Sequence, residues 1–196
     1  MMKDIFAKII SNIFNPFVVT VILLVLLSLK AGNGLRDTVS WLSITVAISV
    51  IPELIIVYLL IHFKKLDSFF SNPREQRTIV YILASVLGAV DCALLWYFKG
   101  PELLAVIFTA GLIGVIVFMA VNYFWKISLH TAFVAASLTA LIIEYGANAA
   151  WAALVLPLVG WSRIILKQHN VLQVVTGGAV AVLIVIGVFW GFGLMG

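Results

Sequence analysis

Apolar runs of about 20 residues, separated by short polar segments, make up most of this chain. A run of that length is what an α-helix needs to cross the hydrocarbon core of a bilayer. The runs predict spans at about 16–30, 39–63, 78–98, 102–124, 130–145, 150–162 and 171–194. The pattern therefore predicts an all-α integral membrane protein, a single transmembrane domain over residues 1–196 built as a bundle of six to seven helices.

The first 13 residues have a different pattern, because their apolar positions fall on one helical face only. That face carries Ile5, Phe6, Ile9, Ile10 and Ile13, and the opposite face carries Lys3, Asp4 and Lys8. An amphipathic helix of this kind is typical of a segment that lies in the membrane interface. We therefore predict an interfacial helix over residues 1–13, ended by Asn15-Pro16.

Composition supports a membrane protein and argues against a protein that binds nucleic acid. The chain is 64% hydrophobic, with a mean hydropathy of +1.20. A net charge of +4 would suggest a nucleic-acid partner in a soluble protein, but here the basic residues fall in short loops, as they do at lipid headgroup level. We expect the bilayer and no nucleic acid as the partner, in a multi-pass protein of the cell membrane. The lone Cys92 permits neither an intrachain disulfide nor a cysteine metal site.

Three polar segments, at 64–77, 125–130 and 163–170, follow the second, fourth and sixth predicted spans. Because each is separated from the next by two crossings, all three face the same side of the membrane. They can therefore meet in one site. The same side, with the N-terminus, carries most of the Lys and Arg residues, but several of these are candidate ligands, so the positive-inside rule only weakly favours a cytoplasmic site.

The third segment holds Arg163, His169 and Gln173 between two apolar runs. Charged groups at that depth are costly and indicate a functional site. His169 and Gln173 are four residues apart and share a helical face, whereas Arg163 requires a turn to converge with His169. A guanidinium binds phosphate through two hydrogen bonds, and a nearby imidazole can attack or protonate. The segment therefore predicts phosphate chemistry.

The second segment contains Lys126, Ser128 and His130. Ser128 occupies an N-cap position, so the first amides of the following helix and the positive end of its dipole would face an anion. His130 lies in the first turn. The alternative is a capping serine and an interfacial histidine with no ligand. Gly177-Gly178, on the last span, predicts close helix packing.

These segments resemble the motifs of the type 2 phosphatidic acid phosphatase superfamily over about residues 64–185. Ser162, Arg163 and His169 match its third motif, Ser-Arg-x5-His-x3-Asp, with Gln173 at the aspartate position. The second motif, Pro-Ser-Gly-His, reads Ile127-Ser128-Leu129-His130 here.

The first motif, Lys-x6-Arg-Pro, is weakly kept. Aligning its arginine on Arg77 places Phe70 at the lysine and Thr78 at the proline. Arg74, one turn from Arg77, or Lys126 could replace the missing cation. The alternative for both arginines is contact with lipid headgroups.

The resemblance implies a phosphatase core that uses no metal and no cofactor. In it, Arg77, Ser128 and Arg163 would hold the phosphoryl group, His169 would attack phosphorus to give a phosphohistidine, and His130 would protonate the leaving oxygen. Gln173 departs from the pattern, because an amide oxygen accepts the imidazole N–H without supplying charge. Losing a triad carboxylate costs about 10⁴ in rate in serine proteases.

Three functions are thus open. The first is a hydrolase acting on a lipid phosphate or diphosphate, such as an isoprenoid or glycerolipid. The second is an inactive member of the same fold that binds anionic lipid phosphate. The third is a transporter using Glu53 and Asp91, two acids within predicted spans.

Overall fold

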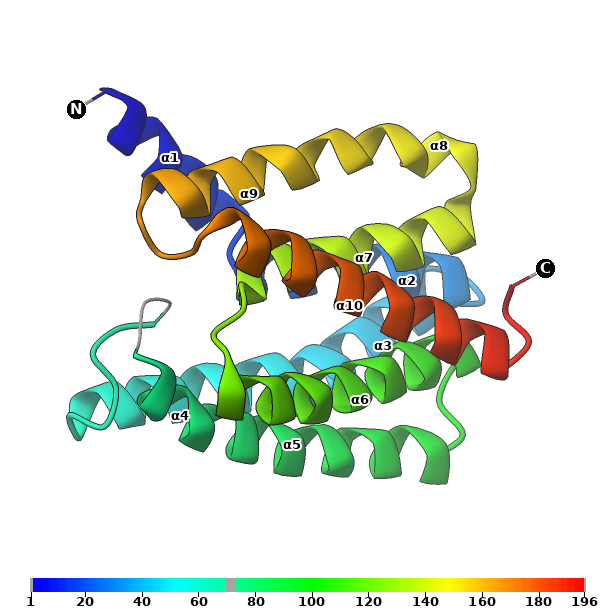
Figure 1. The fold of residues 1–196 in the computed structure, drawn as a ribbon. Coiled ribbons are helices and arrows are strands. Elements are labelled where there is room, and N and C mark those ends of the chain that lie inside the picture. The colour runs from blue at the N-terminus through cyan, green and yellow to red at the C-terminus, as the bar shows by residue number, and fades with distance from the viewer. Residues whose placement is uncertain (1, 70–72, 196) are drawn as a thin grey trace. The chain divides into compact units, whose positions relative to one another are not determined.

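The computed structural model describes residues 2–69 and 73–195, and the elements it forms there are all helical (Figure 1). Their bounds are α1 Met2–Ile13, α2 Pro16–Ala31, α3 Leu35–Thr45, a π-helical segment η1 Val46–Val50, α4 Ile51–His62, α5 Arg74–Tyr97, α6 Glu102–Phe124, α7 Leu129–Tyr145, α8 Ala147–Ala150, a 3-10 turn η2 Trp151–Leu154, α9 Val155–Ile165 and α10 Val171–Gly191.

Five helices of the described chain are long and apolar enough to cross a membrane. They are Leu35–His62, Arg74–Tyr97, Glu102–Phe124, Ala147–Ile165 and Val171–Gly191. The pair formed by α1 and α2, bent by 43° at Asn15, would be a sixth span. The 17-residue α7 is a shorter apolar helix. The predicted all-α membrane bundle is therefore confirmed, with five or six helices of spanning length.

Contacts divide the chain into two compact units. The first contains the chain up to Leu23 and everything from Lys126 onward, and the second contains Leu24–Trp125. The second and third polar segments both belong to the first unit, whereas the segment at 64–77 belongs to the second.

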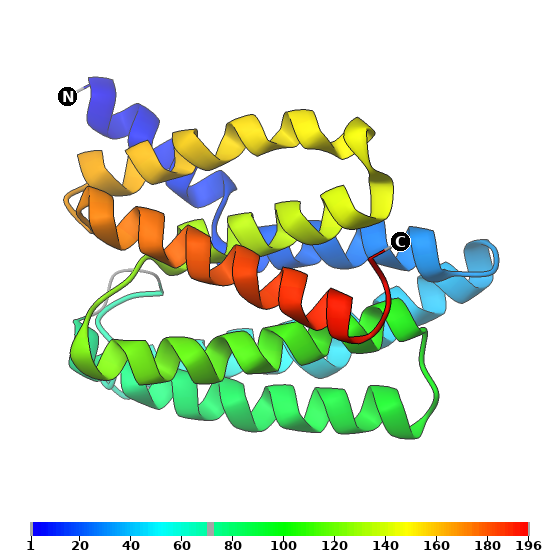
Figure 2. The ribbon, with the colours of Figure 1, turned by 45° about the vertical axis from the view of Figure 1, so that its right-hand side comes forward.

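In the first unit, α7 lies along α10 and also packs against α9 (Figure 2). Helix α1 packs on α9, and a core of four apolar side chains joins these elements: Ile10, Val19, Val134 and Val159. The buried face of α1 consists of Ala7, Ile10 and Ser11. The predicted N-terminal helix is thus present and covers part of α9. Its place in the membrane interface stays a prediction.

In the second unit, α5 and α6 pack side by side after the turn at Gly100-Pro101. The long helix Leu35–His62 is interrupted by η1 and then by Pro52. A π-helical segment shifts the hydrogen-bond ladder by one residue, and the proline lacks the N–H that would continue it. This interruption directly precedes Glu53.

Several helices end in the same way, with a residue in the left-handed conformation just after the C-cap. Lys64, Lys99 and Lys167 have φ values of 56°, 51° and 54° after α4, α5 and α9, and Gly193 has φ 73° after α10. In each case the next N–H donates to a carbonyl five residues back, for example from Gly100 to Leu95 at 2.8 Å. A lysine side chain bears a steric cost in this conformation that glycine does not.

Candidate functional site

The N-terminus of α7 is fastened to the first turn of α10. The backbone N–H of Ser128 donates to the carbonyl of Gln173 at 3.2 Å. The Thr131 hydroxyl lies 3.0 Å from the Ser128 carbonyl and 3.3 Å from the Val174 carbonyl. Ser128 of the segment at 125–130 therefore contacts the first turn of α10, which directly follows the segment at 163–170. That both segments face one side of the membrane stays a prediction.

Two glycines allow this approach. A Cβ on Gly177 would lie 2.8 Å from the carbonyl oxygen of Ser128, and a Cβ on Gly160 would lie 2.8 Å from Val174 Cγ1. Any larger residue at 177 would push the start of α7 away from α10. The close packing predicted at Gly177 is confirmed, and its contact is the backbone of a candidate site residue.

His169 and Gln173 are in contact as predicted, but they do not share a helical face, because His169 lies just before Asn170, the N-cap of α10. The Nδ1 atom of His169 lies 3.3 Å from Oε1 of Gln173, and His169 is only 6% exposed. An amide oxygen can only accept, so in a neutral imidazole this contact requires the proton on Nδ1 and places the lone pair on Nε2. The nucleophilic nitrogen in a phosphohistidine mechanism would then be Nε2.

Gln173 has a second role that the sequence interpretation did not include. Its Oε1 also accepts the backbone N–H of Asn170 at 3.1 Å, while its own backbone N–H donates to Asn170 Oδ1 at 2.9 Å. This reciprocal pair is a capping box at the start of α10. The cap fixes the Gln173 side chain, which in turn presents its oxygen to the imidazole. The Asn-x-x-Gln spacing of residues 170 and 173 is the sequence pattern from which this capping box could have been predicted.

The turn expected between Arg163 and His169 is present. Helix α9 ends at Ile165, and Lys167 takes the left-handed conformation. The carbonyl of Arg163 then accepts the N–H of Gln168 at 3.0 Å and that of His169 at 3.3 Å. The backbone of Arg163 therefore fixes the chain position of His169.

The guanidinium of Arg163 is directed into the protein, where the residue is 3% exposed. Its Nη1 donates to Oγ of Ser11 on α1 at 2.7 Å. Sequence reasoning missed Ser11, although Ala7 and Ser11 form a pair of small residues four apart, a pattern typical of a close helix contact.

The serine of the third motif, Ser162, has a local partner. It is fully buried, and its hydroxyl donates to the Val159 carbonyl at 2.7 Å within α9. The buried hydroxyl of Ser162 thus has its hydrogen-bond acceptor within α9, which is a structural role.

Ser128 and His130 are also buried. Ser128 is the N-cap of α7, as predicted, and its side chain accepts the N–H of Thr131 at 3.4 Å. The N-cap interpretation expects the first amides of α7 to face an anion, and one of these, the N–H of Thr131, is already bonded to the Ser128 side chain. His130 lies in the first turn of α7, as its position in the motif predicts.

Arg74 and Arg77 belong to the second unit. Arg77 is buried, with Tyr81 buried one turn further along α5. Arg74 fastens α5 to α6: its Nη1 donates to the Phe124 carbonyl at 3.1 Å, and its own carbonyl accepts from Asn122 Nδ2 at 3.1 Å. These bonds give Arg74 a structural role beside the predicted one. Lys126 is half-buried at the start of the first unit, and Phe70 lies outside the described residues.

The two intramembrane acids also lie in the second unit. Asp91 on α5 is 4% exposed, and Glu53 on α4 is half-buried just after Pro52. Their charges are close enough to interact. His130 and His169 belong to the first unit.

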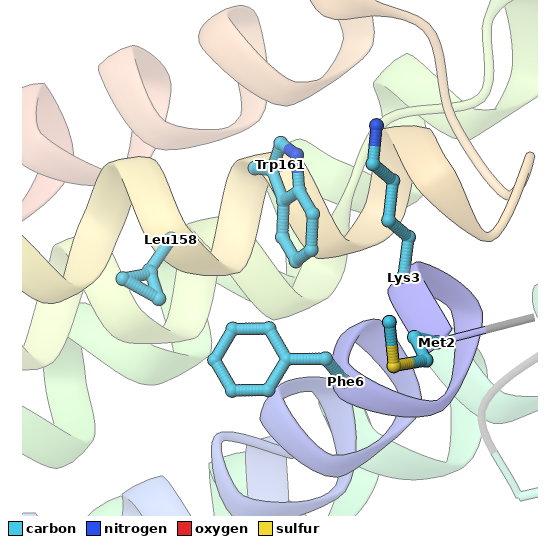
Figure 3. Close-up of a pocket in the computed structure, with 5 residues that line it drawn as sticks. All are labelled: Met2, Lys3, Phe6, Leu158 and Trp161. Atoms are coloured by element: carbon cyan, nitrogen blue, oxygen red, sulfur yellow. The ribbon is translucent and has the colours of Figure 1, made fainter.

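An open apolar groove of about 390 Å³ lies between α1 and α9 (Figure 3). Its lining residues are Met2, Lys3, Phe6, Leu158 and Trp161. The rings of Phe6 and Trp161 are 6.0 Å apart. Together with the bond between Ser11 and Arg163, this ring contact holds α1 on α9.

In the part of the chain that the structure describes, no three His, Cys, Asp or Glu side chains lie close enough together to hold a metal ion. No protein-family model matches the chain, and neither a curated protein nor a solved structure is significantly similar to it. The fold defines the class, an all-α membrane bundle. Within it, one compact unit contains three buried residues of the predicted site, Arg163, His130 and His169.

Proposed function

We propose that this protein is a membrane phosphatase that hydrolyses a lipid phosphate or diphosphate through a phosphohistidine intermediate. The observation that carries the proposal is the contact of His169 Nδ1 with Gln173 Oε1 at 3.3 Å. It leaves Nε2 as a nucleophile, in the same unit as the buried Arg163 and His130. The resemblance to the type 2 phosphatidic acid phosphatases, and a location in the cell membrane, are parts of this proposal.

In the first step, the Arg163 guanidinium binds two oxygens of the substrate phosphate. The Nε2 lone pair of His169 attacks phosphorus, and the bond from phosphorus to the leaving oxygen breaks. Protonated His130 gives its proton to that oxygen. The products of this step are the lipid alcohol, or the lipid monophosphate from a diphosphate, and phosphohistidine 169.

In the second step, neutral His130 takes a proton from water as the water oxygen attacks phosphorus. The N–P bond to His169 breaks, phosphate leaves, and both histidines return to their starting states. Every proton in this cycle is carried by the two imidazoles, and each nucleophile is activated by an adjacent group.

Gln173 sets the expected rate. While His169 carries phosphorus its ring is positive, and Gln173 accepts the Nδ1 hydrogen without offsetting the charge. Orientation is retained and electrostatic stabilisation is weakened, so we expect turnover well below that of an enzyme with a carboxylate here. The neutral Gln173 also favours a second candidate function, a non-catalytic protein that binds anionic lipid phosphate through Arg163.

Phosphate release from the purified protein, over a panel of glycerolipid and isoprenoid phosphates and diphosphates, separates the two functions. A phosphatase releases phosphate, and acid-labile phosphate is trapped on His169 when the reaction is quenched with alkali. His169→Gln abolishes release and retains lipid-phosphate binding. His62→Gln, which changes the exposed histidine of α4, is the matched control and leaves release unchanged.

If His169→Gln releases phosphate as well as the wild type does, the catalytic assignment is wrong. If no lipid phosphate is hydrolysed but several bind, the binding function stands instead.

A further inference from the structure

Ser11 differs from a set of hydroxyl side chains in the helices of this protein. Six of those side chains donate to the carbonyl four residues earlier in their own helix, as a helical hydroxyl commonly does. These are Ser40, Thr45, Ser49, Ser85, Thr109 and Thr139. Ser11 instead accepts from Arg163 Nη1 at 2.7 Å. Within the described chain, the Ser11 hydroxyl proton has no hydrogen-bond acceptor.

Both partners of this bond are buried, Ser11 at 4% and Arg163 at 3% exposure. A buried polar group needs hydrogen bonds, and a hydroxyl supplies one without neutralising the guanidinium. Ser11 therefore holds Arg163 in place without placing a negative charge beside the guanidinium. A carboxylate at the same position would orient the side chain equally well but would consume that charge.

We propose that Ser11 is a phosphate-binding and positioning residue, so that α1 is part of the phosphate site. Its Oγ accepts from Arg163 Nη1, and its hydroxyl proton is donated to an oxygen of the phosphate that Arg163 binds. A hydroxyl both donates and accepts, which allows this relay. The inference rests on the proposed function for its substrate, a lipid phosphate, and it adds a ligand from a helix that lies outside the motifs.

The packing of α1 supports this role. Ala7 and Ser11 lie on the buried face of α1, where small side chains allow close approach to α9. The ring contact between Phe6 and Trp161 holds the N-terminal half of α1 on the same helix (Figure 3). The helix is thus anchored before the Ser11 contact, by Phe6 on Trp161 and by Ile10 in the core.

Two substitutions separate a phosphate ligand from a purely structural hydroxyl. Ser11→Ala removes both hydrogen bonds, and we expect kcat/KM to fall about tenfold or more, the usual size for a hydrogen bond to a charged group. Ser11→Asp retains a partner for Arg163 but repels phosphate, so its kcat/KM falls further and its KM rises more than that of Ser11→Ala. Ser137→Ala, at a similarly buried serine of α7, is the matched control and stays within about twofold of the wild type.

A purely structural Ser11 gives the opposite order. Ser11→Asp would then be as active as the wild type or more active than Ser11→Ala, because its carboxylate holds the guanidinium. That order overturns the proposal, as does a Ser11→Ala protein whose kcat/KM equals that of Ser137→Ala. Thermal unfolding of each variant in the same detergent shows which losses of activity come from loss of folded protein.

A second measurement does not depend on turnover. Phenylglyoxal modifies arginine side chains, and its rate of reaction at Arg163 can be followed by peptide mass spectrometry with and without inorganic phosphate. Phosphate is expected to slow the reaction in the wild type and in Ser137→Ala, and to slow it at least several-fold less in Ser11→Ala. If the wild type hydrolyses no lipid phosphate but shows this pattern, the proposed enzyme fails while the Ser11 site stands. Equal protection in all three proteins overturns the Ser11 site and leaves the enzyme unaffected.

Discussion

The side-chain oxygen of Gln173 lies 3.3 Å from Nδ1 of His169 and, at the same time, 3.1 Å from the backbone nitrogen of Asn170. One atom thus serves the imidazole and the cap of α10. Asn170 completes the cap by accepting from the Gln173 backbone at 2.9 Å. A substitution at 173 therefore changes the charge beside His169 and the stability of the helix start together, and the two effects must be separated.

Glutamate is the substitution that separates them. Gln173→Glu keeps the side-chain length and the capping box while adding a negative charge beside the imidazolium of the transition state. We expect the turnover number to rise about tenfold or more, equivalent to about 1.4 kcal/mol. Gln173→Asp supplies the same charge, but its shorter side chain gives up the Asn170 contact, so it gains less and unfolds at a lower temperature. Steady-state kinetics and thermal unfolding check this, and a Gln173→Glu protein with lower turnover than the wild type contradicts it.

Arg163→Lys keeps the charge but loses the planar group that reaches two oxygens and Ser11 at once. We expect kcat/KM to fall by about 10- to 150-fold, corresponding to about 1.5–3 kcal/mol for hydrogen bonds to a charged group. Arg36→Lys, at an exposed arginine of α3, is the control and should be neutral. Near-wild-type kinetics for Arg163→Lys would show that Arg163 does not grip the phosphate.

Gly177→Ala should destabilise the protein, because the new Cβ would lie 2.8 Å from the Ser128 backbone oxygen. Forcing an extra carbon into such a contact costs about 1–3 kcal/mol, and α7 must shift relative to α10. Gly187→Ala on the same helix has open space around its Cβ and should stabilise by about 0.5–1 kcal/mol through helix propensity. Thermal unfolding in one detergent measures both. Equal effects of the two substitutions would mean that the Ser128 contact is not as close as described.

Lys99→Gly should stabilise the protein by about 1 kcal/mol, because Lys99 holds a left-handed conformation, with φ 51°, that glycine adopts without steric cost. Gly193 already occupies the equivalent position after α10, so Gly193→Ala should have the opposite sign. The difference in unfolding temperature between the two variants is the measurement. A destabilising Lys99→Gly would indicate that the Lys99 side chain contributes more than its backbone strain costs.

Chelation should leave turnover unchanged, because the proposed mechanism relies on Arg163 and two histidines, and among the residues that the structure describes no His, Cys, Asp and Glu side chains gather in a metal-binding cluster. Phosphate release measured with excess EDTA should stay within about twofold of the untreated rate, a margin well below the several kcal/mol that a metal ion supplies when it stabilises charge. Activity lost in EDTA and restored by Mg²⁺ would refute this mechanism.

Local patterns in the sequence predicted much of what the structure contains. Apolar runs gave the helices, and Asn15-Pro16 marked the bend, where Asn15 Oδ1 accepts the N–H of Val18 at 3.0 Å. The four-residue spacing of His169 and Gln173 predicted their contact. Each of these depends on neighbours within one or two helical turns.

The features that were missed depend on tertiary packing. Ser11 meets Arg163 across 152 residues of sequence, and no periodicity in α1 indicates which helix its buried face contacts. Arg74 has the spacing of a substitute phosphate ligand, but its bond to the Phe124 carbonyl comes from the packing of α5 on α6. The capping role of Gln173 is an exception, because it is local. The spacing of Asn170 and Gln173 is that of a capping box, whereas the motif resemblance concerns only the missing charge at position 173.

The separation of Ser11 and Arg163 also bears on how the protein is made. Helix α1 leaves the ribosome before α9, and at about 5–20 residues per second the guanidinium that it must meet follows roughly 8–30 s later. During that interval the hydroxyl of Ser11 has no arginine to accept from, while the intervening helices enter the bilayer. Premature release of the chain before α9 would therefore leave a protein without the Arg163 half of the proposed phosphate site. The N-terminal helix is the first part of the site to be synthesised, and it gains its partner among the last.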